Sequence, residues 1–143
     1  LTIYGSGSQK EKLAKLAKKL HAKLKIFPPT SYQKLPKLLH QFDIFTLVSY
    51  KEGSPKILLE AMAGGIAIIG SNVVGIRELV TSGHNAILTQ TDPASIAKAI
   101  EKLKDARLRQ KLGEAARKFV EEKFDLEKLL VLETNLLKAA AQK

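Results

Sequence analysis

The sequence of 143 residues contains no cysteine and no tryptophan, and only one methionine. The absence of cysteine excludes disulfide bonds and thiolate catalysis, and it fits a cytosolic protein. No run of 18 uninterrupted apolar residues is present, so the sequence predicts no membrane-spanning helix. No group of residues has the spacing of a zinc site, and no Ser-His-Asp arrangement is suggested.

Acidic residues are also scarce, because 14 Asp and Glu face 24 Lys and Arg and give a formal charge of +10. Residues 1–40 hold nine lysines and one glutamate, whereas residues 41–97 hold three basic and five acidic residues. A basic balance favours phosphates, nucleic acids or anionic membranes without choosing among them. We expect no specific nucleic-acid binding, because few aromatic side chains are interleaved with the lysines.

Short apolar segments alternate with amphipathic ones along most of the chain, and 45% of the residues are hydrophobic. The pattern predicts strands over residues 1–4, 24–27, 43–49, 66–70 and 86–89. It predicts helices over residues 9–23, 32–41, 55–63, 75–83, 93–104, 107–122 and 126–141. The expected fold is one α/β domain over residues 1–143, with a Rossmann-like parallel sheet, helices on both faces and a helical extension over residues 105–143.

The stretch "EGSPKILLE" places two carboxylates, Glu52 and Glu60, beside the expected end of a buried strand. In open parallel sheets, ligands bind at the carboxyl ends of the strands. Ser54 is a candidate N-cap and Pro55 a candidate first helical residue. The free N–H groups of this helix start would suit a phosphate or a sugar hydroxyl. The expected donors are Gly53, Ser54, Lys56 and Ile57.

Each of these features also has a purely structural interpretation. Glu60 could be a buried acid that pairs with Arg77 or a lysine, and Glu52 could be a solvated loop charge. Alternatively, paired carboxylates suit the vicinal hydroxyls of a sugar, because each oxygen accepts hydrogen bonds. The turn "GSGS" could cradle a phosphate or simply reverse the chain, and it lacks both G-x-G-x-x-G and the Walker lysine.

The stretch "EGSPKILLE" resembles the E-x7-E motif of retaining glycosyltransferases with the GT-B fold, specifically family 4, the "glycosyl transferases group 1". Further segments are similar to that family in the same order along nearly the whole chain. They are "LTIYGSGS", "DIFTLVS", "EAMAGGIAIIG", "GIRELVTSGHN" and "DPASIAKAI". The resemblance implies the C-terminal, donor-binding half of a two-domain enzyme.

The resemblance also implies roles for individual residues. Glu60 would bind the ribose hydroxyls of a nucleotide-sugar, and Glu52 would contact the donor sugar as the candidate catalytic residue. The remaining implied contacts to the nucleotide-sugar come from Gly53, Ser54, Pro55 and Lys56 near the sugar and diphosphate, Gly5 and Gly7 on the crevice floor, and Phe27 and Pro28 near the base. The donor would be a UDP-, GDP- or ADP-sugar, with no cofactor and no metal.

Compared with the family, the sequence begins after a strand–helix unit that carries an Arg and a Lys for the diphosphate, and it lacks the N-terminal Rossmann-like domain. We therefore expect the isolated chain to be inactive and to self-associate through an exposed edge. Ala67 replaces a common proline, "FPPT" replaces the usual base-side loop, and Ser54 stands where an aromatic residue often stands. The expected location is cytoplasmic, with peripheral contact to an anionic membrane. The alternative is a non-catalytic nucleotide-binding or protein-interaction module.

Overall fold

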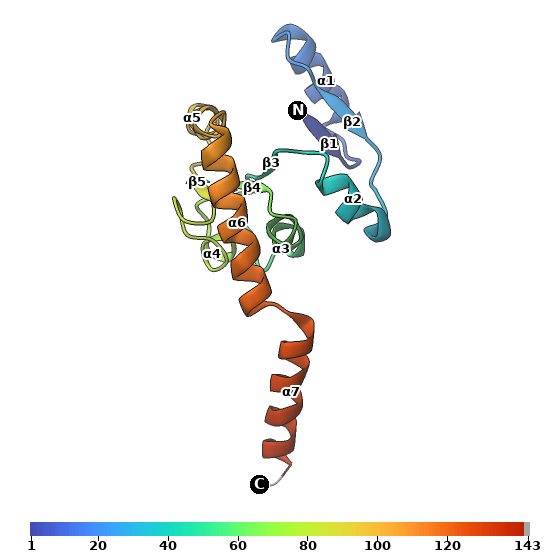
Figure 1. Cartoon of the computed structure of the whole chain (residues 1–143). Helices are drawn as coiled ribbons and strands as arrows, with labels where there is room; N and C mark the ends of the chain where they lie inside the picture. The colour runs from blue at the N-terminus through green and yellow to red at the C-terminus, as the bar shows by residue number, and fades with distance from the viewer. Residues whose placement is uncertain (142–143) are drawn as a thin grey trace. The chain divides into compact units, whose positions relative to one another are not determined.

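The computed structural model describes residues 1–141, and it divides the chain into two compact units, Leu1–Leu38 and Leu39–Lys143 (Figure 1). Each unit contains its own parallel sheet. The mixed α/β class, the parallel strand pairing and the helical C-terminal third are confirmed. The expectation that all 143 residues form one domain stays a prediction.

The first unit is a β-α-β arrangement. Strands β1 (Thr2–Tyr4) and β2 (Lys25–Phe27) pair in parallel with Ile3 opposite Ile26, and α1 (Lys10–Lys19) connects them. The predicted helix over residues 32–41 is divided into a 3₁₀ turn (Tyr32–Lys34) and α2 (Leu35–Leu39). Pro36 accounts for the division, because proline lacks an N–H and fits only the first turn of a helix.

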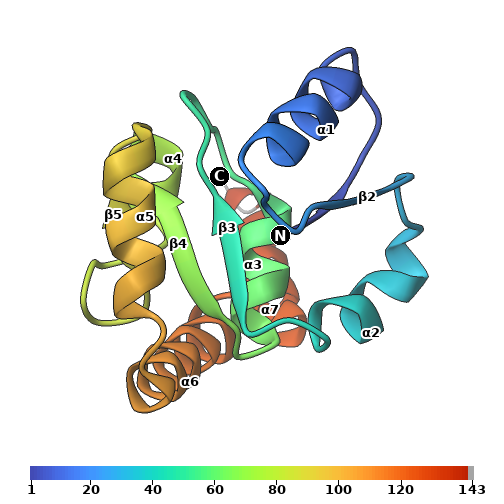
Figure 2. The same ribbon diagram turned by 90° about the horizontal axis from the view of Figure 1, so that it is seen from above.

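The second unit contains a three-stranded parallel sheet in the order β3-β4-β5. Its strands are β3 (Ile44–Leu47), β4 (Ala67–Ser71) and β5 (Ile87–Thr89). Its helices are α3 (Lys56–Ala63), α4 (Val74–Arg77), α5 (Pro93–Lys102), α6 (Ala106–Lys123) and α7 (Leu126–Ala140). Figure 2 shows α3 and α5 on opposite sides of this sheet.

The central strand β4 is buried along its whole length. Alternate residues of a strand face opposite sides of the sheet. Ala67 and Ile69 lie in a buried cluster whose other members come from α5 and α6, namely Ala99, Leu103 and Leu112. Gly70 faces the other side, where a Cβ would touch the side chain of Ile76 in α4. Helices therefore cover both faces of the sheet, as the apolar strand sequences predict.

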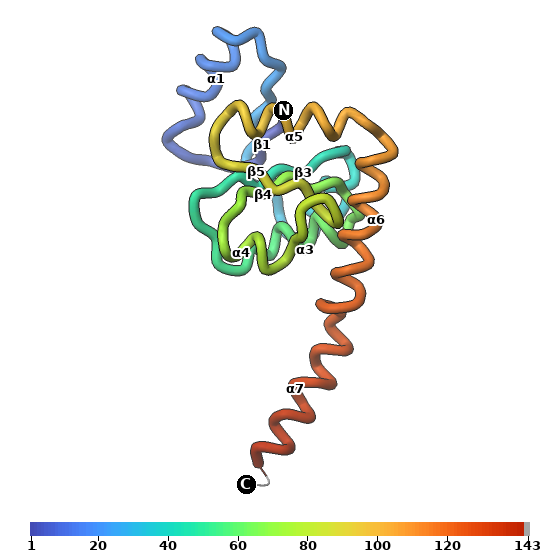
Figure 3. Tube along the Cα trace, turned by 90° about the vertical axis from the view of Figure 1, so that its left-hand side faces the viewer, coloured from blue at the N-terminus to red at the C-terminus, as the bar shows by residue number. Residues whose placement is uncertain are grey.

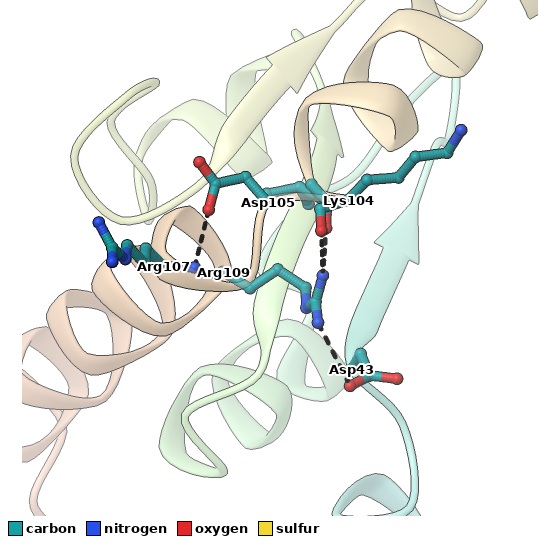
Figure 4. Close-up of polar contacts among 6 residues, drawn as sticks. Asp43, Lys104, Asp105, Arg107 and Arg109 are labelled. Atoms are coloured by element: carbon teal, nitrogen blue, oxygen red, sulfur yellow. Dashed lines mark hydrogen bonds and ion pairs between the residues drawn. The ribbon is translucent and has the colours of Figure 1, made fainter.

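The corner between α5 and α6 is fixed by Arg109 (Figure 4). The guanidinium Nη1 donates to the carbonyl oxygens of Leu103, at 2.7 Å, and Lys104, at 3.0 Å. Its Nη2 lies 3.9 Å from Oδ1 of Asp43, just before β3. One side chain thus satisfies carbonyl groups at the end of α5 and links that corner to the sheet.

Aspartate side chains cap the last three helices. Asp92, Asp105 and Asp125 accept hydrogen bonds from backbone N–H groups at the starts of α5, α6 and α7. Hydrogen bonds from Ser95, first from its side chain and then from its backbone N–H, hold the pKa of the Asp92 carboxyl below its usual range. Figure 3 follows α6 into α7, a helix with no buried residue.

The helix predicted over residues 75–83 is wrong in length, because α4 spans only Val74–Arg77. The backbone then turns, with Gly83 at a φ of 79°. The buried Asn85 side chain accepts a hydrogen bond from the N–H of Thr81 at 2.7 Å and donates to the carbonyl oxygen of Leu79 at 3.5 Å. A side chain thus replaces helical hydrogen bonds in this turn.

We expect Asp105→Ala to lower the free energy of unfolding by about 1 kcal/mol, because it removes the acceptor for two N–H groups at the start of α6. Oδ1 of Asp105 lies 2.8 Å from the nitrogen of Arg107 and 3.3 Å from that of Leu108. Urea denaturation of the two proteins measures the difference. Lys111→Ala, an exposed change on the same helix, is the control, and equal losses from both substitutions would contradict the capping role.

Candidate functional site

The candidate site in the second unit lies at the carboxyl ends of β3 and β4. The two strands pair in register, with Leu47 opposite Gly70. The Oγ of Ser71, which is fully buried, donates a hydrogen bond of 2.6 Å to the carbonyl oxygen of Ser49. This bond joins the two chain segments immediately beyond the paired residues. The loop that carries Glu52 therefore starts from a fixed point.

The start of α3 differs from the sequence prediction by one residue. Pro55 is the N-cap, with extended backbone (φ −74°, ψ 101°), and helical geometry begins at Lys56. The prediction that Ser54 is the N-cap and Pro55 the first helical residue is wrong. No side chain caps this helix, whereas aspartates cap α5, α6 and α7. The first turn of α3, like those of α1 and α4, thus has no side-chain acceptor for its N–H groups.

Several backbone donors remain unused at this helix start. Within residues 1–141 the structure records no hydrogen bond from the N–H groups of Gly53, Ser54, Lys56 or Ile57, whereas that of Leu58 donates to Pro55 at 3.0 Å. The N-terminal end of a helix also carries the positive end of the helix dipole. Free donors and positive potential together make this position suitable for an anion or for oxygen atoms of a sugar.

Both carboxylates are half-buried and unpaired. Glu60 lies in α3, and Glu52 lies in the loop before it. In the part of the chain that the structure describes, neither side chain forms an ion pair or a hydrogen bond, and the alternative of a Glu60–Arg77 pair is wrong. Arg77 itself is exposed. A carboxylate that loses water without gaining a protein partner is available to a ligand.

The other predicted site residues lie together in the first unit. The N–H of Gly5 donates to the carbonyl oxygen of Phe27 at 3.0 Å, which joins the carboxyl ends of β1 and β2. The Phe27 ring, 41% exposed, stacks on Tyr4 with 5.1 Å between ring centroids. Pro28, the next residue, is exposed. A Cβ added to Gly7 would have no neighbouring atom within 4 Å. The structure thus places Gly5, Gly7, Phe27 and Pro28 in one unit and the other candidates, residues 52–56 and Glu60, in the other.

Two surface pockets lie outside these groups. One, of about 260 Å³, lies between β5 and α5 and includes Asn72, Gln90, Lys98 and Lys102 in its lining. The other lies between α1 and β2 in the first unit. Neither includes Glu52 or Glu60. Among residues 1–141, no group of three or more His, Cys, Asp or Glu side chains could hold a metal ion, and no helix is long and apolar enough to cross a membrane.

Sequence reasoning missed two residues of this region. Ser71 was assigned no role, although its hydroxyl joins the ends of β3 and β4. Gly75 appears in the sequence only as part of the segment "GIRELVTSGHN", although its backbone lies against that of Glu52 and Gly53. A glycine inside a helix is unfavourable by propensity, and that was the available signal for Gly75.

A sequence profile of the family described as "Glycosyl transferases group 1" matches residues 1–119. The match covers most of the chain, and the protein therefore belongs to this family of transferases. Together with the fold, this confirms the resemblance to the glycosyl transferases group 1.

Individual relatives support the same assignment. The chain is 35% identical over 132 residues to N-acetyl-alpha-D-glucosaminyl L-malate synthase from Bacillus anthracis, a match that covers 91% of this chain and 35% of that protein. It is 32% identical over 130 residues to a glycogen synthase from Mycobacterium tuberculosis, covering 87% of this chain and 31% of the relative. The chain thus spans about a third of the length of these relatives.

Solved structures show the same fold. Sucrose-phosphate synthase from Thermosynechococcus elongatus superposes with a TM-score of 0.89 at 21% identity, over 99% of this chain and 38% of that one. HepE from Anabaena, solved in complex with UDP-glucose, gives a TM-score of 0.83 at 20% identity, over 96% of this chain and 40% of that one. The architecture is that of GT-B glycosyltransferases.

Because neither carboxylate has a protein partner, we expect Glu52→Gln and Glu60→Gln each to change the free energy of unfolding by no more than about 0.5 kcal/mol. Urea denaturation at neutral pH tests both variants against the unmodified chain. A loss above about 2 kcal/mol for Glu60→Gln would indicate a structural pair instead of a binding residue.

Proposed function

We propose that the chain binds the nucleotide-sugar donor of a retaining glycosyltransferase of family 4. The observation that carries the proposal is the pair of half-buried, unpaired carboxylates, Glu52 and Glu60, on either side of an uncapped helix start with free N–H groups. The E-x7-E spacing and the family membership support the same assignment. The UDP-glucose complex of HepE supports a nucleotide-sugar as the ligand class.

Glu60 accepts hydrogen bonds from the ribose hydroxyls, because a carboxylate can bind two vicinal hydroxyls at once. Glu52 contacts the donor sugar. The N–H groups of Gly53, Ser54 and Lys56 face the sugar and the diphosphate, with Pro55 fixing the backbone between them. The contacts that the family resemblance implies for Gly5, Gly7, Phe27 and Pro28, which lie in the first unit, stay a prediction.

The chemical requirement of the transfer is stabilisation of the charge that develops on the leaving diphosphate. Free N–H groups and the positive end of the α3 dipole stabilise negative charge without further rearrangement. In this proposal the reaction needs no metal ion, and the sugar keeps its anomeric configuration. Because the chain spans about a third of the length of its relatives, we expect it to bind donor by itself without transferring sugar.

A non-catalytic nucleotide-binding module is the second candidate. The same observations support it, since the unpaired carboxylates and free N–H groups could hold a nucleotide without a transfer reaction. Binding alone does not separate the two candidates. Hydrolysis or transfer of the donor sugar by the longest available form of the protein would favour the enzyme.

The test of donor binding is thermal unfolding in the presence of UDP, GDP, ADP and their sugar conjugates at millimolar concentration. A ligand at several times its dissociation constant should stabilise the chain by about 1 kcal/mol, which raises the melting temperature by roughly 2–4 °C. We expect a rise for one nucleotide family in the unmodified chain and none in Glu60→Gln.

The matched control is Glu133→Gln on α7, which makes the same chemical change at an exposed position. It should retain the full rise in melting temperature. Absence of any rise in the unmodified chain would contradict donor binding by this chain, and an equal rise in Glu60→Gln would contradict the role of Glu60.

A further inference from the structure

Gly75 lies inside α4 and is buried, yet nothing in its own backbone requires glycine. The glycines with positive φ among the described residues are Gly65 and Gly83. At a helical position alanine has the most favourable propensity and glycine one of the least. The reason for glycine at this position must therefore be space.

The space is taken by the backbone of the donor loop, residues 50–54. A Cβ built on Gly75 would overlap the carbonyl oxygen of Gly53, and it would lie 2.5 Å from the carbonyl oxygen of Glu52 and 2.7 Å from the carbonyl carbon of Gly53. All three are backbone atoms, which cannot rotate away as a side chain can. Figure 3 shows α4 beside this loop at one end of the sheet. Any side chain at Gly75 must separate the two segments.

This contact also determines which way the peptide groups of the donor loop point. In a trans peptide the C=O and the following N–H point in opposite directions, and the chain has no cis peptide bonds among its described residues. Because the carbonyls of Glu52 and Gly53 face Gly75, the N–H groups of Gly53 and Ser54 face away from α4. These are two of the donors that the structure leaves unused.

We propose that Gly75 is a positioning residue for the part of the site that contacts the donor sugar. This inference rests on the donor-binding function proposed above. Its missing side chain lets α4 hold the donor loop so that Glu52 and the two outward N–H groups can meet the sugar and diphosphate. Glu60 is on α3, outside this contact. Gly75 therefore governs recognition of the sugar more than recognition of the nucleotide.

The test compares Gly75→Ala with Gly113→Ala. A Cβ at Gly113 would also overlap a backbone carbonyl oxygen, that of Gly65, but this contact joins α6 to the turn after α3, at the opposite end of α3 from the donor loop. The two variants thus introduce the same kind of clash at different places. Both should unfold at lower temperature, which makes Gly113→Ala the control for general destabilisation.

Dissociation constants are measured for UDP, UDP-glucose and UDP-N-acetylglucosamine by calorimetry. The preference for the sugar is the dissociation constant for UDP divided by that for the tighter-binding UDP-sugar. In Gly75→Ala we expect this ratio to fall at least fivefold, while the dissociation constant for UDP itself changes less than threefold. In Gly113→Ala the preference should be unchanged. An unchanged preference in a folded Gly75→Ala variant would overturn the proposal.

Two further measurements test the position of the donor loop without any ligand, so their results do not depend on donor binding. Amide NMR resonances of Gly53 and Ser54 should shift in Gly75→Ala and stay in place in Gly113→Ala. In the unmodified chain without ligand, these two amides should exchange with water nearly as fast as in an unfolded peptide, and strong protection would overturn the outward orientation. If the unmodified chain binds none of the three probes, the donor-binding function fails for UDP compounds and with it the effect on sugar preference, whereas the NMR results still decide whether Gly75 positions the donor loop.

Discussion

The fully buried central strand β4 is the constraint on which the second unit depends. Its alternating side chains pack against α5 and α6 on one face and against α4 on the other, and its backbone pairs with β3 and β5. A one-residue shift in register would exchange the two faces, so the pairing is strongly specified. Since β3 and β4 run parallel, this register also brings their carboxyl ends together. The hydroxyl of Ser71 then fixes Ser49, the residue just before the donor loop.

Much of this arrangement follows from the sequence, because the apolar segments are distinct. All five strands and the three C-terminal helices occur where the pattern predicts them, with boundaries that shift by a few residues. The errors lie where side chains or proline compete with helical hydrogen bonds. Asn85 ends α4 early by accepting from Thr81. Pro55 is extended and moves the start of α3 by one residue.

The candidate site was predictable only in part. The sequence shows which residues carry suitable side chains, but it does not show which contacts those residues make in the fold. Glu52 and Glu60 stand out in the sequence as charges beside apolar residues at a recognisable spacing. Whether they have partners depends on tertiary contacts, which no local pattern contains. The same holds for Gly75, whose neighbours are more than twenty residues earlier in the chain. The sequence therefore indicated the candidate side chains and missed the backbone contact between Gly75 and the loop that carries Glu52.

The composition has a practical consequence for spectroscopy. The chain has no tryptophan and only three tyrosines, so its intrinsic ultraviolet emission comes from tyrosine alone. Tyr4 stacks on Phe27 beside the base-side candidates, and the exposed Tyr50 lies two residues before Glu52. Two of the three natural fluorophores therefore lie next to the two groups of candidate binding residues. A tryptophan introduced at either position would report on its own group without background from any other indole.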